Sequence, residues 1–432
     1  MSLDPSPELA LDAILSGFLS GFQIVVVQLG QEDDAQAIFA SLNGNAQPLT
    51  SFDLIRNDIF HRARKANEDD DALYNNYWND LETDFWKKEV KQGRLKRPRT
   101  HHLITHALVA ETGQDINVGQ VSNEYRRFSE KRAFESVAEE VKSLLRYARA
   151  YEEMERRQKG QALAQVASFL DVWDMSAFHP IVLWTSVQDI AQEDKDAIYA
   201  FIESYLIRRD ICDLTNKNYN KVVPALLRDI HIASDARAAF FKHTTELAGD
   251  VSRIPVDAEV VTSIVKKPLY QQLGSRKLRY VFSKIEQHLR SKYDEKVVVA
   301  VDDLTVEHIM PSVWAKNWPL QSGATVGSEN YFSLTALGIE VGEVVRREME
   351  VREAAKHTLG NLTMLTYSLN PALGNSGWLY KKGLIAKSLL VINRSIAEHD
   401  DWNEDTIEAR GVKLASTINE IWPYPDEFKK VG

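Results

Sequence analysis

The sequence contains a single cysteine, Cys212, among 432 residues. One thiol excludes an intramolecular disulfide and any zinc site built from several cysteines, and it favours a reducing, cytoplasmic compartment. Long apolar runs are also missing, because the longest one near the start, residues 24–27, is far shorter than a membrane span. No charged segment precedes an apolar stretch, so we expect neither a signal peptide nor a membrane partner.

Positive charge is not in excess either. The net charge of -10 argues mildly against a surface covered with nucleic-acid contacts. The sequence nevertheless contains two local runs of basic residues. Residues 87–99 hold seven cations and one acid, and a second run comprises Lys266, Lys267, Arg276, Lys277 and Arg279. Such runs are more often solvated faces than binding sites, and both interpretations stay open at this point.

Helical periodicity dominates the chain. Apolar residues at three- and four-residue steps predict one helix through 73–85 and a long helix over 133–157. Further helices are predicted at about 178–191, 195–208, 218–230, 235–248 and 269–290. The pattern changes near residue 294, after which strands are predicted at 297–301, 304–309 and 362–366, and helices at 340–356 and from 373 onward.

A chain of this length exceeds one ordinary core, so several domains are expected. We predict a mostly α protein with a small α+β part. Residues 1–66 are expected to be the last part of a larger domain, 67–293 a helical middle domain, and 294–432 a separate C-terminal domain.

The segment 306–311, Val-Glu-His-Ile-Met-Pro, carries the strongest chemical signal. His308 can accept a proton at neutral pH, as the base that activates a water must. Glu307 offers a carboxylate and Asn370 a side-chain carbonyl, the oxygen ligands that Mg²⁺ prefers. Asn361 can hold the histidine loop through hydrogen bonds to its backbone. Together these parts predict metal-assisted cleavage of a phosphodiester.

One geometric condition applies to this prediction. Adjacent residues on a regular strand point to opposite faces, so Glu307 and His308 share a site only if His308 lies at the strand end. Pro311 is compatible with such an end, because proline cannot continue a ladder. In isolation, a Glu-His-x-x-Pro segment is usually a half-buried histidine beside a turn; the ordered set with both asparagines favours a nuclease.

Other histidines are also candidate metal ligands. His102 and His106 lie four residues apart, with His101 beside them, but the apolar residues around them favour a core helix. His357 lies four residues before Asn361 and is a candidate further metal ligand, or alternatively a plain helix-end histidine.

Six segments carry a resemblance to a known family: 306–311, 359–365 (Leu-Gly-Asn-Leu-Thr-Met-Leu), 368–370 (Ser-Leu-Asn), 380–382 (Tyr-Lys-Lys), 402 with 407–410, and 421–423 (Ile-Trp-Pro). On these segments, residues 300–432 resemble the C-terminal nuclease domain of GmrSD-type modification-dependent (type IV) restriction enzymes, a branch of the HNH, or His-Me finger, nucleases. The resemblance implies a ββα-metal domain. It also implies the site roles: His308 as general base, Asn361 as the middle asparagine of the HNH pattern, Glu307 and Asn370 as ligands of one Mg²⁺ or Mn²⁺ ion, and Lys381, Lys382 and Arg410 as phosphate contacts.

The front of the chain resembles the same family. Residues 37–43 and 49–57 are similar to the last part of its N-terminal nucleotide-hydrolysing domain, and 203–212 fits its helical region. An Asp-Gly-Gln-Gln-Arg motif and a Gly-x-x-x-x-Gly-Lys-Ser/Thr loop are both missing from the sequence. NTP hydrolysis is therefore not expected for this chain alone.

The expected function is a cytoplasmic, metal-dependent DNA endonuclease of a restriction system, which defends against phage and other foreign DNA. By family analogy its substrate is modified DNA. A homodimer is one option for its assembly. Two alternatives stay open: a non-catalytic DNA- or partner-binding module with a vestigial HNH site, and a nuclease directed at RNA.

Overall fold

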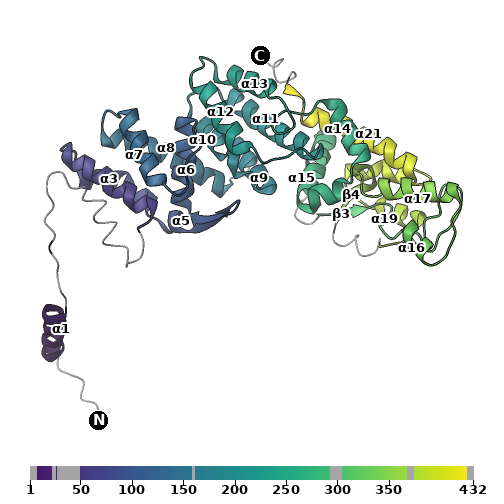
Figure 1. Cartoon of the computed structure of the whole chain (residues 1–432), viewed down its shortest axis with the longest axis horizontal. Helices are drawn as coiled ribbons and strands as arrows, with labels where there is room; N and C mark the ends of the chain where they lie inside the picture. Colours follow the sequence, from purple (N-terminus) through teal and green to yellow (C-terminus); the bar gives the residue numbers. More distant parts are fainter. Residues whose placement is uncertain are drawn as a thin grey trace, which may run out of the picture. The chain divides into compact units, whose positions relative to one another are not determined.

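A computed structural model describes residues 7–21, 26, 49–157, 161–291, 304–366 and 374–425 (Figure 1). The chain divides into two compact units, Met1–Ile59 and Phe60–Gly432. The predicted strand at 297–301 and the predicted ligand Asn370 lie outside the described residues. None of the described helices combines the length and apolar character that a membrane span requires.

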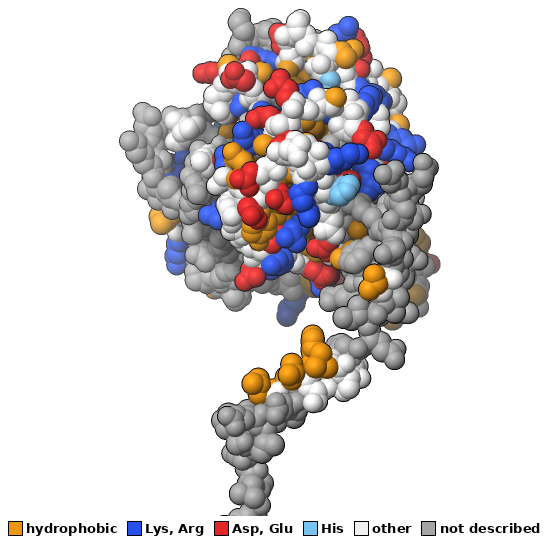
Figure 2. Space-filling view, turned by 90° about the vertical axis from the view of Figure 1, so that its left-hand side faces the viewer, with side chains coloured by type: hydrophobic (Ala, Val, Ile, Leu, Met, Phe, Trp, Pro, Cys, Tyr) orange, Lys and Arg blue, Asp and Glu red, His pale blue; other side chains and the backbone are white. Residues whose placement is uncertain are grey.

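The first unit contains helix α1 (Pro7–Gly21), and α3 (Ser51–Lys65) leads from it into the second unit. One face of α1 is apolar, because its large apolar residues recur at three- and four-residue steps. These side chains are exposed and appear as a row of orange groups in Figure 2: Leu11, Ile14, Leu15, Phe18 and Leu19.

The single helix predicted through residues 73–85 is wrong. The structure has three short pieces instead: α4 (Asp70–Asn76), η2 (Trp78–Leu81) and α5 (Asp84–Lys87). Tyr77 separates the first two with a non-helical backbone (φ −136°, ψ −58°). The apolar stripe that prompted the prediction is nevertheless buried, since Leu73, Trp78 and Leu81 are all in the core.

The other predicted helices of the second unit's helical part are present, and α7 (Val121–Arg132) and α9 (Ala162–Trp173) add two that were not predicted from the sequence. The long helix predicted over 133–157 is α8 (Val137–Arg156). The other elements are α6 (Arg99–Thr112), η3 (Ser176–Phe178), α10 (His179–Val187), α11 (Gln192–Ile211), α12 (Tyr219–His231) and α13 (Ala236–Glu246). Helix α6 packs against α7, α8, α10 and α12, so it forms the centre of this part.

A two-stranded antiparallel hairpin precedes α6. Strand β1 (Glu89–Gln92) pairs with β2 (Leu95–Pro98), with Glu89 opposite Pro98 and Gln92 opposite Leu95. The predicted basic run 87–99 therefore lies largely on this hairpin.

The C-terminal part combines a second small sheet with helices. The strands predicted at 304–309 and 362–366 are present as β3 (Leu304–His308) and β4 (Leu362–Thr366), and they pair antiparallel. The remaining elements are α14 (Asp257–Lys266), α15 (Leu269–Ser291), α16 (Tyr331–Ala336), α17 (Glu343–Ala355), η5 (Leu359–Asn361), α19 (Trp378–Ile385), α20 (Val391–Arg394), η6 (Ile396–Glu398) and α21 (Glu404–Ile421). The fold is thus mostly α with little strand, which confirms the predicted class at this level.

Helices α14 and α15 join the helical part to the C-terminal part. Helix α14 packs against α21, while α15 contacts β3, β4, α20 and α21 as well as α9 and α11. Helix α15 is kinked at Gly274, whose φ of 70° is the left-handed conformation that glycine adopts most readily. The domain boundary expected at 293/294 stays a prediction.

A buried arginine adds a second link. The guanidinium of Arg208, on α11, is fully buried and donates to the carbonyl oxygens of Pro255 (2.9 Å) and Trp422 (2.9 Å). It also pairs with Asp257 at 2.5 Å. A buried charge is stable only when it is paired and hydrogen-bonded, so these contacts fix α11 to the start of α14 and the end of α21.

Candidate active site

His308 is the last residue of β3. It lies opposite Leu362, and the chain then leaves the sheet through Ile309 and Met310. The strand therefore ends where the sequence predicted, ahead of Pro311. This position meets the geometric condition under which His308 and Glu307 can face one site.

Asn361 secures the chain where it leaves β3. Its side chain is fully buried, and it makes four hydrogen bonds. Its Nδ2 donates to the carbonyls of Met310 and Lys356, both at 2.8 Å, while its Oδ1 accepts from the Met310 amide (2.8 Å) and from Trp402 Nε1 (3.0 Å). The Asn361 carbonyl also accepts from Ile309 N at 2.9 Å. Asn361 thus holds the loop backbone, which is the contact expected from the sequence.

The ring of His308 is itself held by two groups. Its Nε2 lies 3.0 Å from Nδ1 of His357, the residue two positions after α17. The Tyr270 ring, on α15, packs against it with 4.4 Å between ring centroids, and the same ring is nearly parallel to that of His357 (17° between planes). Tyr270 N also donates to the His357 carbonyl at 3.1 Å. The imidazole carried by β3 is therefore contacted by α15 and by the segment that follows α17.

Both imidazoles are neutral at neutral pH. Burial lowers the pKa of His308 to about 3, with further lowering from the nearby His357, Lys381 and Lys356. Burial also lowers the pKa of His357, and the Lys356 cation adds to the effect. Two neutral rings can share one proton along their contact, because one nitrogen donates and the other accepts. His308 Nδ1 has no hydrogen-bond partner among the residues that the structure describes.

Lys381 lies beneath the strand end. Its side chain is buried, and its Nζ donates to the His308 carbonyl at 3.0 Å. Burial lowers its pKa to about 8, while the negative charge of Glu307 acts in the opposite direction. Glu307 is half-buried and lies opposite Thr363 in the register. Lys381 therefore connects the predicted carboxylate ligand to the backbone of the predicted base.

Arg410 is also buried, and it hydrogen-bonds to the backbone. It lies on α21 and donates from Nη1 to the carbonyls of Gly360 (2.7 Å) and Leu362 (2.6 Å). Burial lowers its pKa to about 9. As placed, Lys381 and Arg410 face the interior, so Lys382 is the predicted phosphate contact nearest to solvent, with its Nζ 3.6 Å from the exposed Asp400.

Gly360 allows η5 to lie directly on α21. A Cβ at this position would be 2.0 Å from the Ile407 carbonyl oxygen, a distance that real Cβ atoms do not reach. The Leu-Gly-Asn segment therefore needs glycine for close backbone approach, and this approach sets the position of Asn361 next to it.

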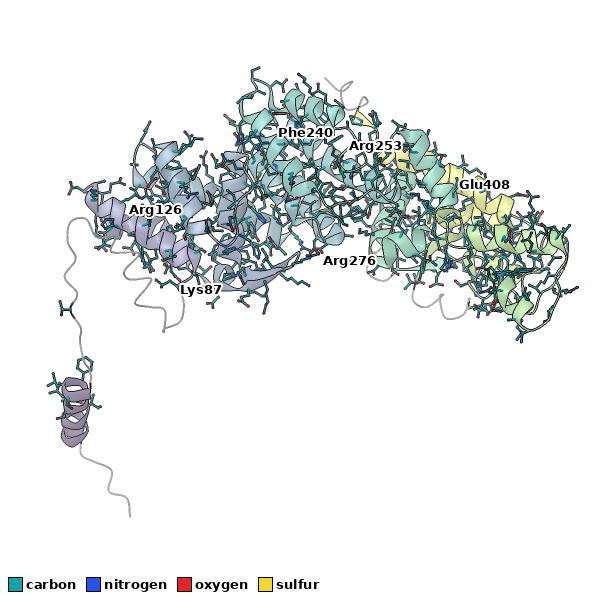
Figure 3. All side chains as sticks on the ribbon, in the orientation of Figure 1. Lys87, Arg126, Phe240, Arg253, Arg276 and Glu408 are labelled. Atoms are coloured by element: carbon teal, nitrogen blue, oxygen red, sulfur yellow. The ribbon has the colours of Figure 1, made fainter. Side chains whose placement is uncertain are left out.

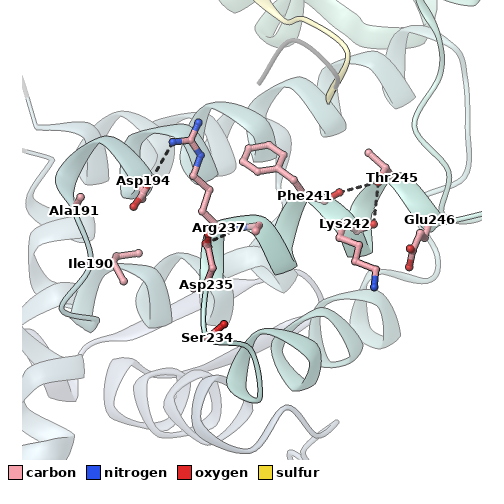
Figure 4. A pocket seen from close by; sticks show the side chains of 12 residues that line it. Ile190, Ala191, Asp194, Ser234, Asp235, Arg237, Phe241, Lys242, Thr245 and Glu246 are labelled. Carbon is pink, nitrogen blue, oxygen red and sulfur yellow. Dashed lines mark hydrogen bonds and ion pairs between the residues drawn. The ribbon is translucent and has the colours of Figure 1, made fainter. Parts of the chain in front are cut away.

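No group of three His, Cys, Asp or Glu side chains that could hold a metal ion occurs among the residues the structure describes. The three histidines of α6 are buried in the core, as the sequence favoured. A pocket of about 880 Å³ lies at α11 and α13 instead, with Asp194 and Arg237 paired at 3.0 Å on its wall (Figure 4). None of its lining residues belongs to the predicted site.

Tyr270 and the His308–His357 contact were not foreseen from the sequence. Tyr270 is an aromatic residue near the start of a long helix, where nothing in the periodicity distinguishes it from a packing residue. From the sequence, His357 is a candidate metal ligand. The signal for its orienting role is its position, as a second imidazole shortly before the Leu-Gly-Asn segment. The roles of all these residues stay predictions.

The arrangement defines a class of site: a neutral, oriented imidazole at a strand end, preceded in the strand by Glu307, is a group of the kind that hydrolases use to activate water. Residues 255–417, less than half of the chain, match the family model of GmrSD restriction endonucleases, C-terminal domain. The match confirms the resemblance to the GmrSD family for this part of the chain. It does not reach residues 1–66, whose relation to the family stays a prediction. No curated protein matches the chain.

Proposed function

We propose that this protein is a metal-dependent endonuclease that cuts DNA in a restriction system, with His308 as its general base. The observation that carries the proposal is the oriented, neutral imidazole of His308 at the end of β3, in a region that matches a restriction endonuclease family. The antiparallel pair β3–β4 followed along the chain by α19 also supports a ββα-metal nuclease.

His308 would take the proton from the attacking water through Nδ1. His357 occupies Nε2, so it fixes the tautomer and the direction of the ring. Burial and neighbouring cations account for the low pKa of His308, and the negative charge of an incoming phosphate would raise it toward the working range. We therefore assign His357 as a positioning residue for His308, in place of the metal-ligand role considered from the sequence.

A divalent ion, Mg²⁺ or Mn²⁺, would supply charge neutralisation at the scissile phosphate and the leaving oxygen when bound. Glu307 and Asn370 are the residues that would hold it. The donor set fits Mg²⁺, which keeps several waters and binds through only one or two protein carboxylates. Lys381 would keep the Glu307 carboxylate close to the His308 backbone.

The biological substrate follows from the family. The matching family consists of restriction endonucleases, so the substrate is foreign DNA, and the modification dependence implied by the resemblance makes modified DNA the preferred target. Lys382 would contact a phosphate near the cut.

Plasmid nicking tests the proposal. Intact protein should cut with Mg²⁺ or Mn²⁺ and not with EDTA, and His308→Ala should lower the rate by at least about 10²-fold, the usual contribution of a general base. His61→Ala is the matched control, since His61 is exposed on α3 and should keep full activity. His357→Ala should cause a smaller loss and change the pH–rate profile, while His357→Gln restores part of the rate. Metal-independent cutting, or full activity of His308→Ala, would refute the proposal, and preferential cutting of RNA would reassign the substrate.

A further inference from the structure

The β1–β2 hairpin carries an exposed positive surface on a protein whose net charge is -10. The exposed cations on it and just before it are Lys87, Lys88, Lys91, Arg94, Lys96 and Arg97. The one carboxylate of this stretch, Glu89, pairs with Lys96 at 3.1 Å. Among the described residues, Lys87, Lys91 and Arg94 have no acidic partner. Unpaired cations held on a rigid ribbon remain available to an anionic partner.

The second basic run approaches the same place. Asp171 accepts from Arg276 of α15 at 2.6 Å and from Arg157 at 3.3 Å. Arg157 and Asp171 also line a pocket of about 230 Å³ together with Lys91 of the hairpin. Figure 3 labels Lys87 and Arg276, and the hairpin runs from the side of the first toward the second. Of the second basic run, Arg276 thus lies near the hairpin, where Asp171 neutralises it, whereas Lys277 pairs with Asp210 and Lys266 with Glu408.

The pocket between these groups is not itself an anion site. Glu155 and Asp174 line it along with Asp171, so its interior carries negative charge. The positive surface lies on the exposed outer side of the hairpin instead.

Helix α15 leads from this surface to the candidate active site. Arg276 follows the kink at Gly274, and Tyr270 precedes it on the same helix. The Tyr270 ring packs on that of His308. Helix α15 therefore carries both Arg276, which pairs with Asp171 on the wall of the pocket next to the hairpin, and Tyr270, which contacts the predicted base.

We propose that the hairpin Glu89–Pro98 and the adjoining Lys87 bind the phosphate backbone of double-stranded DNA, as a second contact beyond the cleavage site. This inference rests on the proposed function. A two-stranded β-ribbon fits the major groove of duplex DNA, and cations on it can reach the phosphates on either side. Such contacts hold the DNA in position while His308 activates the attacking water at the separate cleavage site.

The test uses the full chain with His308→Ala, so that binding is measured without cutting. A triple variant, Lys87→Ser, Lys91→Ser and Arg94→Ser, is compared with a matched triple, Lys217→Ser, Lys221→Ser and Lys242→Ser. The control residues are equally exposed cations around α12 and α13. Affinity for a DNA duplex is measured from 50 to 200 mM salt, and thermal melts check that both variants are folded.

Loss of three phosphate contacts should make the slope of log affinity against log salt shallower by about 2.7, while the control keeps the parent slope. Equal slopes for the hairpin variant and the parent would overturn the proposal. If the hairpin variant lost affinity for an RNA duplex but not for the DNA duplex, the assignment to DNA would be overturned. The proposed function fails separately, if the unaltered protein binds through the hairpin but shows no metal-dependent cutting.

Discussion

Replacing Asn361 by aspartate should destabilise the protein strongly at alkaline pH and less so at acid pH. The substitution preserves shape and keeps the acceptor that binds Met310 N and Trp402 Nε1. It replaces the donor by an oxygen that faces two carbonyl oxygens, those of Met310 and Lys356, across 2.8 Å contacts. Each lost bond leaves a buried acceptor unsatisfied at about 1–3 kcal/mol, so we expect a loss of about 4 kcal/mol. A typical domain has only about 5–15 kcal/mol of unfolding free energy.

The pH dependence follows from the sign of the pKa shift. Burial beside two carbonyls raises the pKa of the introduced carboxyl above its unfolded value. The folded variant therefore binds a proton before the unfolded chain does, and the deficit shrinks as pH falls through the folded pKa. Urea unfolding at pH 8 and at pH 5 gives the difference in unfolding free energy between parent and variant at each pH. Nicking activity should fall with stability of the loop, although His308 is unchanged.

Asn330→Asp is the matched control for this substitution. Asn330 is exposed and caps α16 by accepting from Phe332 N at 2.9 Å. Aspartate serves equally well as an N-cap, so the unfolding free energy should change by only a few tenths of a kcal/mol. An Asn361→Asp protein as stable as the parent at pH 8, or one whose deficit is the same at both pH values, would show that the two bonds donated by Asn361 Nδ2 do not hold the loop.

Two further predictions concern stability. Gly360→Ala should cost about 3 kcal/mol or prevent folding, because its Cβ would lie 2.0 Å from the Ile407 carbonyl oxygen. The control Gly383→Ala, in α19 with nothing within 4 Å of the added Cβ, should stabilise slightly. Differential scanning calorimetry measures both melting temperatures, and similar shifts for the two variants would contradict the contact. Stability should also fall between pH 6.5 and about 4. Burial lowers the pKa values of His101 and His179 to about 4 and lowers that of His106 well below its usual value, so the unfolded chain takes up protons first. His106→Phe should flatten this pH profile in urea titrations, and an unchanged profile would be the contrary result.

The elements of the site were predictable where local patterns decide them. The strand predicted over 304–309 ends one residue earlier, at His308, and Pro311 is compatible with that end; the strand predicted over 362–366 is β4. The predicted hydrogen bonds of Asn361 to the loop backbone are also present, and they satisfy its buried amide.

Other parts depend on tertiary contacts that leave little local trace. Arg410 is an exception: the resemblance implies a phosphate contact, but its spacing from the buried Ile407 and Leu414 places it on the inner face of α21. Lys381 had no such signal, because α19 is short and its neighbours Tyr380 and Lys382 are polar. The break at Tyr77 depends on a backbone conformation that periodicity does not report.

The order of the pieces along the chain has a consequence for biosynthesis. Strand β3 ends at His308, but its partner β4 begins at Leu362. The intervening segment contributes Trp314 and Met349 to an apolar cluster that also includes Leu365 of β4 and Ile407 of α21. Pairing over so long a loop is entropically slow, so the sheet closes late in folding. A nascent polypeptide that has emerged only through β3 has no His357 to orient the imidazole. On the proposed function, a chain translated only through β3 would therefore lack the group that holds His308 Nε2 and would not cut DNA.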